Sequence, residues 1–205
     1  MRVRAFWCAV IAVLSFGCAH TGTLSTPSGN HLSLGNHGLN VFPGRPVPCP
    51  MGTGDGEVLK SWDTGKKRVR GQCLGGLMVG EWKAWYQNGA LEWTATFSGG
   101  LMVGVFHSFF ANDQQRAKVM YRDGFPEGEA KLWHFGGKVA AKGSYVGGRK
   151  NGCWEEWHPN GEKASKGTWA DDRQVATWLY WTLDGTRRKE KLGGEPLHGE
   201  CLLTL

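Results

Sequence analysis

The sequence contains no catalytic signature. It has no nucleophile elbow, no pair of metal ligands at helical spacing and no phosphate loop; Gly52-Thr53-Gly54 is not followed by a helical pattern. Acidic residues such as Glu155 and Glu156 are scattered rather than gathered into a catalytic pair. We therefore predict that the protein is not an enzyme and uses no cofactor.

Long apolar runs are also missing beyond the N-terminus. The run from Ala5 to Phe16 is shorter than the roughly 20 residues that a membrane-spanning helix needs. It follows Arg2 and Arg4 and precedes small residues, which is typical of an export signal. We predict a signal peptide over residues 1–17, whose removal lowers the net charge from +6 to +4.

The end of this signal allows two kinds of processing. Residues Leu14 to Cys18 resemble the lipobox of bacterial lipoproteins, which implies that Cys18 is acylated and anchors the chain to a membrane. The Ala19 that follows is compatible with sorting to the outer membrane, on its periplasmic side or at the cell surface. Ordinary cleavage after Ala19, giving a soluble periplasmic or secreted protein, is the alternative.

Residues 18–55 are predicted to be a tether. They are rich in Gly, Ser, Asn, His and Pro and lack periodicity, so they bury too little apolar surface to fold alone. Runs of five or six like charges are absent throughout the chain. Because an exported protein does not normally meet nucleic acid, we exclude nucleic acid as a partner.

Glycine recurs every 24 residues, at Gly80, Gly104, Gly128 and Gly152. A sustained period of this length is typical of stacked supersecondary units. Each period contains two short segments rich in aromatic and β-branched residues, which predict a β-hairpin. We therefore predict an all-β fold, an elongated array of stacked antiparallel β-hairpins over residues 56–205, with about six units.

Turn signals divide each unit. Asn88-Gly89 and Asn160-Gly161 favour two-residue hairpin loops with positive φ at both residues. Units are joined through corners such as Gly75-Gly76. The second strand alternates regularly, whereas aromatic residues stand three apart in the first strand, as in Trp82 and Trp85. Either a bulge brings these to one face or both faces carry aromatics.

The pattern Gly-x-Trp-x-x-Trp-x-x-Asn-Gly, seen from Gly80 to Gly89, resembles the bacterial variant of the MORN repeat. The resemblance covers about residues 56–201. It implies a β-hairpin array that binds proteins or membranes, and it brings no catalytic residues. Some bacterial members carry antitoxin labels, so a protein that neutralises a toxin by binding is a further alternative.

Two sets of residues are candidate binding sites. Lys118, Lys142 and Lys166 share one repeat position and would form a basic stripe with steps of about 10 Å. Solvated lysines that discourage aggregation explain the stripe equally well. The aromatic candidates are drawn from the 11 Trp of the chain and are Trp82, Trp85, Trp154 and Trp157. They would stack on glycans, or they form the core of a thin sheet.

Four cysteines remain after the signal and Cys18. We predict a disulfide between Cys49 and Cys73, with free thiols as the alternative. Cys153 and Cys201 begin units two repeats apart, about 19 Å along a regular sheet, so a bond between them is excluded.

We predict no metal site, because His134 and His158 would lie about 10 Å apart. The predicted function is that of a non-catalytic binding or scaffolding module at the bacterial cell envelope. Its partner would be an unknown protein or an anionic membrane or envelope component. The alternative is a glycan-binding or cell-wall-binding module that uses the aromatic residues.

Overall fold

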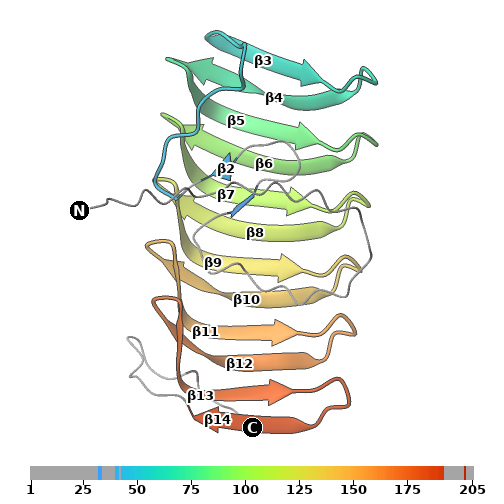
Figure 1. The fold of residues 1–205 in the computed structure, drawn as a ribbon, viewed down its shortest axis with the longest axis vertical. Coiled ribbons are helices and arrows are strands. Elements are labelled where there is room, and N and C mark those ends of the chain that lie inside the picture. The colour runs from blue at the N-terminus through green and yellow to red at the C-terminus, as the bar shows by residue number, and fades with distance from the viewer. Residues whose placement is uncertain (1–31, 34–39, 42, 192–200, 202–205) are drawn as a thin grey trace, which may run out of the picture.

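The protein is an open antiparallel sheet of 12 strands in which every strand pairs with its neighbours in sequence (Figure 1). The computed structural model describes residues 32–33, 40–41, 43–191 and 201. The signal peptide, Cys18 and most of the predicted tether therefore lie outside the described residues. Within the described ranges, no helix is long and apolar enough to cross a membrane.

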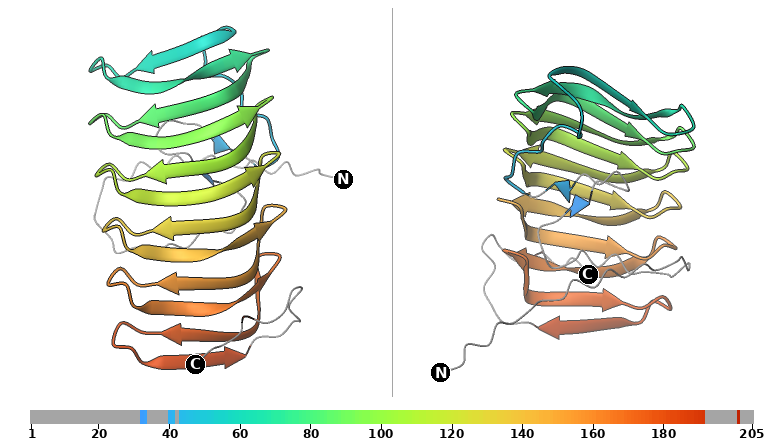
Figure 2. Two further views of the ribbon diagram at one scale, coloured as in Figure 1. Left: turned by 180° about the vertical axis from the view of Figure 1, so that it is seen from behind. Right: turned by 45° about the horizontal axis from the view of Figure 1, so that its top comes forward.

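Six hairpins make up the sheet, and all lie in one twisted layer (Figure 2). Its strands are β3 (Gly56–Ser61), β4 (Lys67–Leu74), β5 (Leu77–Trp85), β6 (Leu91–Ser98), β7 (Leu101–Phe109), β8 (Gln115–Arg122), β9 (Phe125–Trp133), β10 (Val139–Val146), β11 (Arg149–Trp157), β12 (Lys163–Ala170), β13 (Arg173–Trp181) and β14 (Arg187–Lys191). A separate pair joins β1 (Leu32–Ser33) to β2 (Asn40–Val41). The predicted all-β array of stacked hairpins is confirmed.

The two edges of the array carry different loops. The turns within hairpins, on the right in Figure 1, have five residues between strands, as from Tyr86 to Ala90. Gly89 donates its N–H to the carbonyl of Tyr86, and only Gly89 of the Asn88-Gly89 pair has positive φ. The prediction of two-residue turns here is therefore wrong. The Asn88 amide instead donates to the carbonyl of Ala111 in the next hairpin.

Two-residue loops occur at the opposite edge, where successive hairpins are joined. Gly75 and Gly76 have φ of 59° and 74°, the double positive φ that a tight, twisted hairpin loop requires. The same geometry is adopted by Asp171 and Asp172, with φ of 50° and 63°. Short Asp side chains tolerate this left-handed conformation better than most residues.

The glycine of the 24-residue period forms a bulge near the middle of β5, β7, β9 and β11. Gly80 has φ of 66°, and the register between β4 and β5 shifts next to it, between the pairs Arg70 to Lys83 and Gln72 to Val79. Ala176 keeps a positive φ of 58° at the equivalent point in β13.

Aromatic residues line both faces of the sheet. Trp82 is fully buried on one face, which we call the core face, whereas Trp85 is half-buried on the other, which we call the polar face. The core face also carries Met78, Trp93, Phe97 and Met102, each with at most 3% exposure. The register with β6 shifts between Ala84 and Trp85, but the residue that it skips is Glu92 of β6. The alternation along β5 therefore continues, and the two-face alternative holds.

Neighbouring hairpins fit together through paired large and small residues on the core face. The indole of Trp154 lies flat on Gly143, and its N–H donates to the carbonyl of Ser144. Trp82 on Gly71 and Trp178 on Gly167 repeat this arrangement. One repeat earlier, Ala130 stands at the position of Trp154, and the residue opposite it is Val119 rather than a glycine. In the sequence, Ala130 only interrupts a series of aromatic residues. In the structure, the larger side chain of Val119 compensates for the missing aromatic ring.

Residues 43–55 differ from the tether predicted for 18–55, because they pack along the corners of the array (Figure 1). We call this segment the arm. Gly44, Val47 and Cys49 donate their N–H groups to the carbonyls of Gly124, Gly100 and Gly76. Val47 is 4% exposed and belongs to the core. A disulfide joins Cys49 in the arm to Cys73 in β4, with their Cα atoms 6.1 Å apart.

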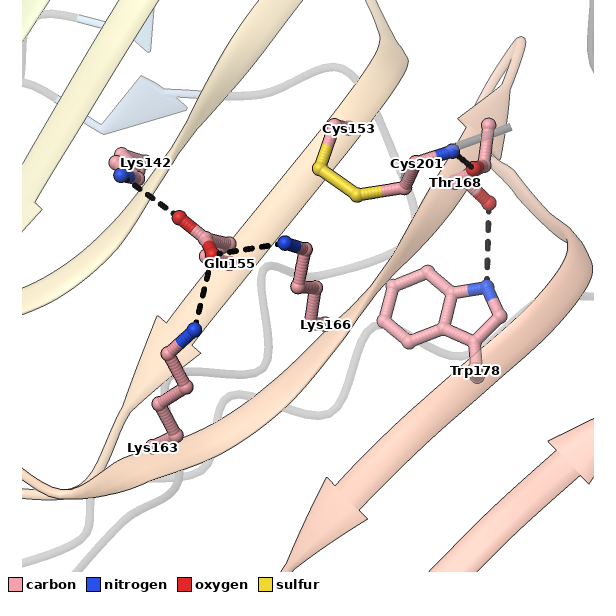
Figure 3. The surroundings of a disulfide bond; sticks show 8 residues. All are labelled: Lys142, Cys153, Glu155, Lys163, Lys166, Thr168, Trp178 and Cys201. Atoms are coloured by element: carbon pink, nitrogen blue, oxygen red, sulfur yellow. Dashed lines mark hydrogen bonds and ion pairs between the residues drawn. A yellow bond between two sulfur atoms is a disulfide. The ribbon is translucent and has the colours of Figure 1, made fainter. Parts of the chain in front are cut away.

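The exclusion of a bond between Cys153 and Cys201 is wrong. Their Cα atoms lie 4.9 Å apart, and a disulfide joins them (Figure 3). The exclusion assumed that Cys201 continues the regular stack of strands. Instead, the last strand ends at Lys191, and Cys201 lies on the polar face, where its N–H donates to Thr168 Oγ1.

Candidate functional site

The register of the sheet aligns one polar-face residue from each strand into a row that crosses the array. In order, the row is Leu59, Arg70, Lys83, Thr94, His107, Lys118, Lys131, Lys142, Glu155, Lys166, Leu179 and Lys189. Seven of these positions are cationic, and Glu155 is the one acid among them.

Three lysines from adjacent strands are the most concentrated part of this row. Lys131 in β9 is the register partner of Lys118 in β8 and of Lys142 in β10, and all three are exposed. Like charges directly opposite each other on neighbouring strands are destabilising. Within the described residues, no ion pair involves Lys118 or Lys131. We call these three residues the lysine row.

The predicted stripe is therefore only partly available to a ligand. Glu155 accepts ion pairs from Lys142 at 2.7 Å, from Lys163 at 3.3 Å and from Lys166 at 3.4 Å (Figure 3). The Lys166 side chain is 12% exposed, so this residue belongs to an internal ion-pair cluster rather than to a binding surface. Lys131, which the repeat pattern does not indicate, lies between Lys118 and Lys142 instead.

The ion-pair cluster makes stability depend on pH. Burial acts to raise the pKa of Glu155, but hydrogen bonds from Lys142 and Lys163, together with their charges, outweigh it and lower the pKa to about 2. Because this lies below the ordinary value of 4.5, the stabilisation is complete above about pH 4.5 and is lost as the pH falls toward 2.

We expect Glu155→Gln to lower the free energy of unfolding at pH 7 by about 1 kcal/mol, since solvent screens the half-exposed lysines. The difference from the wild type should shrink between pH 4.5 and pH 2. Urea unfolding at several pH values measures it. A gap between the two proteins that stays constant over this range would contradict the role given to Glu155.

A column of half-buried aromatic residues accompanies the lysine row on the polar face. Its members occupy the last position of the first strand in the second to the sixth hairpin and are Trp85, Phe109, Trp133, Trp157 and Trp181. The ammonium groups of Lys131 and Lys142 lie 5.3 Å and 5.4 Å from the ring centres of Trp133 and Trp157.

Two of the four predicted aromatic binding residues are excluded by burial. Trp82 and Trp154 have no exposed surface, and each packs on a glycine of the preceding strand. Their part in the aromatic hypothesis is therefore wrong, and they are core residues. Trp85 and Trp157 lie on the polar face and keep part of their rings accessible.

A groove opens on the polar face between the turn ends of the fourth and fifth hairpins. It is lined by Lys131, Gly137, Lys138, Val139, Lys142, Trp157, Asn160 and Gly161. Lys138 spans the two turns by donating to the carbonyl of Asn160. The groove thus combines an indole ring and a valine side chain with three ammonium groups, of which Lys138 also bonds to Asn160 and Lys142 to Glu155.

Histidines contribute hydrogen bonds between units. The Nε2 atoms of His134 and His158 lie 2.7 Å and 2.8 Å from the carbonyls of Trp157 and Trp181 in the next hairpins. In the part of the chain that the structure describes, no group of three His, Cys, Asp or Glu residues is placed to hold a metal ion. In the row itself, burial and then the charge of Lys118 lower the pKa of His107.

Comparison with protein families matches residues 150–171 to the MORN repeat variant. A search of curated proteins finds no match. Among solved structures, the chain is similar to one in the crystal structure of a GtfA/B complex bound to UDP and GlcNAc, with 10% identity and a TM-score of 0.20. That similarity covers 71% of this chain and 25% of the other, and at such a TM-score it supports no conclusion.

The matched residues run from β11 to the corner that follows β12, which is one full hairpin of the array. The other hairpins repeat its antiparallel pairing, and the second to the sixth share its bulge, so the matched residues are one unit of a repeated structure.

Proposed function

We propose that the protein is a non-catalytic binding module of the cell envelope and that the lysine row on β8, β9 and β10 holds an anionic partner. The observation that carries the proposal is the direct pairing of Lys131 with both Lys118 and Lys142. Lys142 is partly neutralised by Glu155, whereas Lys118 and Lys131 are two exposed like charges that face each other without an ion pair to any described residue. Their repulsion costs stability, and a bound anion would offset that cost. A MORN-repeat array is suited to this role, because it offers a long surface for binding.

An envelope location is supported by two independent features. The sequence begins with the predicted signal peptide 1–17 and the lipobox-like Cys18. The two disulfides are of the kind that persists in oxidising compartments such as the periplasm. We propose that a lipid on Cys18 holds the array at the periplasmic side of the outer membrane or at the cell surface.

Sedimentation with envelope fragments tests the binding role. A chain with Cys18→Ala removes the lipid and leaves binding to the folded array. We expect Lys118→Glu with Lys131→Glu to weaken cosedimentation by about tenfold, and salt to weaken the wild type similarly.

Arg149→Glu is the matched control. It reverses an exposed charge at the corner end of β11, at the edge opposite the groove, and should leave binding unchanged. Equal cosedimentation of the lysine-row variant and the control would refute the proposed surface.

A further inference from the structure

The groove beside the lysine row has the chemistry of a carbohydrate site. Its apolar part is the half-buried indole of Trp157 together with Val139, and its polar rim is formed by Lys131, Lys138 and Lys142. Among the described residues that line it, none is acidic. An indole face packs well on the apolar face of a sugar ring, while ammonium groups bind carboxylates.

The same two elements repeat along the array. Trp133 occupies in the fourth hairpin the place of Trp157 in the fifth, about 10 Å away across two strands. Lys131 lies by Trp133, and Lys142 lies by Trp157. A linear ligand with a regular alternation of apolar rings and negative charges can therefore contact both positions in one orientation.

We propose that the groove binds an acidic polysaccharide, with the sugar rings against Trp157 and Trp133 and their carboxylates near Lys131, Lys138 and Lys142. This inference rests on the proposed function and names its ligand class. A flat anionic membrane fits less well, because Trp157 is half-buried and offers an inserting surface only part of its ring. An acidic peptide would use the lysines and leave the aromatic column without a role.

Calorimetric titration of the full mature chain with three polymers tests the ligand class. Polygalacturonate carries sugar rings and carboxylates, its fully methyl-esterified form keeps the rings without the charge, and polyglutamate keeps the charge without the rings. We expect polygalacturonate to bind at least about tenfold more tightly than either of the others.

Two variants assign the contacts. Trp157→Leu should weaken polygalacturonate about tenfold and leave polyglutamate unchanged, because it removes a ring and no charge. Lys131→Gln should weaken binding of both charged polymers. Arg149→Glu serves again as the control, and the melting temperature of each variant shows that its array is folded.

The outcomes separate the two proposals. If polyglutamate binds as tightly as polygalacturonate, and Trp157→Leu changes neither, the carbohydrate inference fails while the anion-binding surface stands. If polygalacturonate does not bind and cosedimentation with envelope fragments still depends on Lys118 and Lys131, the carbohydrate inference alone is overturned. If neither assay depends on these lysines, both proposals fail.

Discussion

Gly143→Val is expected to lower the free energy of unfolding by about 3 kcal/mol or more, whereas the same change combined with Trp154→Ala is expected to cost much less than the sum of the two single changes. A Cβ atom on Gly143 would lie 2.2 Å from the indole of Trp154. The ring is fully buried and its N–H is bound to the carbonyl of Ser144, so it has no space to move.

The combination of valine and alanine that the double variant would create already occurs elsewhere in the protein. In the preceding hairpins Val119 faces Ala130 at the positions that Gly143 and Trp154 occupy one unit later. Trp154→Ala alone should cost about 3–5 kcal/mol, because it leaves a cavity over the glycine. Valine at residue 143 then fills part of that cavity, and we expect a favourable coupling of about 2 kcal/mol in the double-mutant cycle.

Urea unfolding followed by tryptophan fluorescence and circular dichroism measures these free energies. Gly136→Val is the matched control, since Gly136 has ordinary φ and no atom within 4 Å of an added Cβ. Additive costs for Gly143→Val and Trp154→Ala would mean that the two positions do not share one space, contrary to the structure.

Loss of the disulfide between Cys49 and Cys73 is expected to release the arm and to cost about 3 kcal/mol of stability. The bond closes a separation of 24 residues and fixes the arm against the first corner of the array. Beyond Cys49, the arm is held by the N–H groups of Val47 and Gly44, which bond to corner carbonyls. Without the covalent link, backbone hydrogen bonds and the packing of Val47 have to hold the segment.

Hydrogen exchange measured by mass spectrometry follows the arm directly. In a variant with Cys49→Ala and Cys73→Ala, we expect peptides within residues 43–55 to exchange at least about tenfold faster, because local opening becomes easier. The corresponding pair Cys153→Ala and Cys201→Ala is the control, since that bond lies at the other end of the array. Protection of the arm that is unchanged in the first variant would show that the disulfide is not what holds it.

The sequence predicted the architecture well because the signal is repeated. A 24-residue period and strands with alternating burial are local properties, and six copies reinforce each other. The two-residue turns were predicted at the wrong edge, because both edges of the sheet carry glycine. Only the φ values and hydrogen bonds distinguish Gly89 from the pair Gly75 and Gly76.

The candidate site was less predictable, because it depends on register between strands. Lys118 and Lys142 share a position in the second strand of their hairpins, so the repeat pattern identifies them. Lys131 lies in the first strand of a hairpin, and only the pairing places it between them. The Cys153–Cys201 bond is non-local in the same way, since it joins residues 48 apart in the sequence and Cys201 lies beyond the end of β14.

The two edges of the sheet differ in how easily their loops can change in length. Two-residue corners leave no room for inserted residues, and three of their carbonyls are already bound by the arm. The turns within hairpins are longer, with five residues each, and the groove opens between two of them. Insertions are therefore accommodated more easily in the turns than at the corners, and under the binding role proposed above they would change the groove one hairpin at a time while the stacking of the strands stays the same.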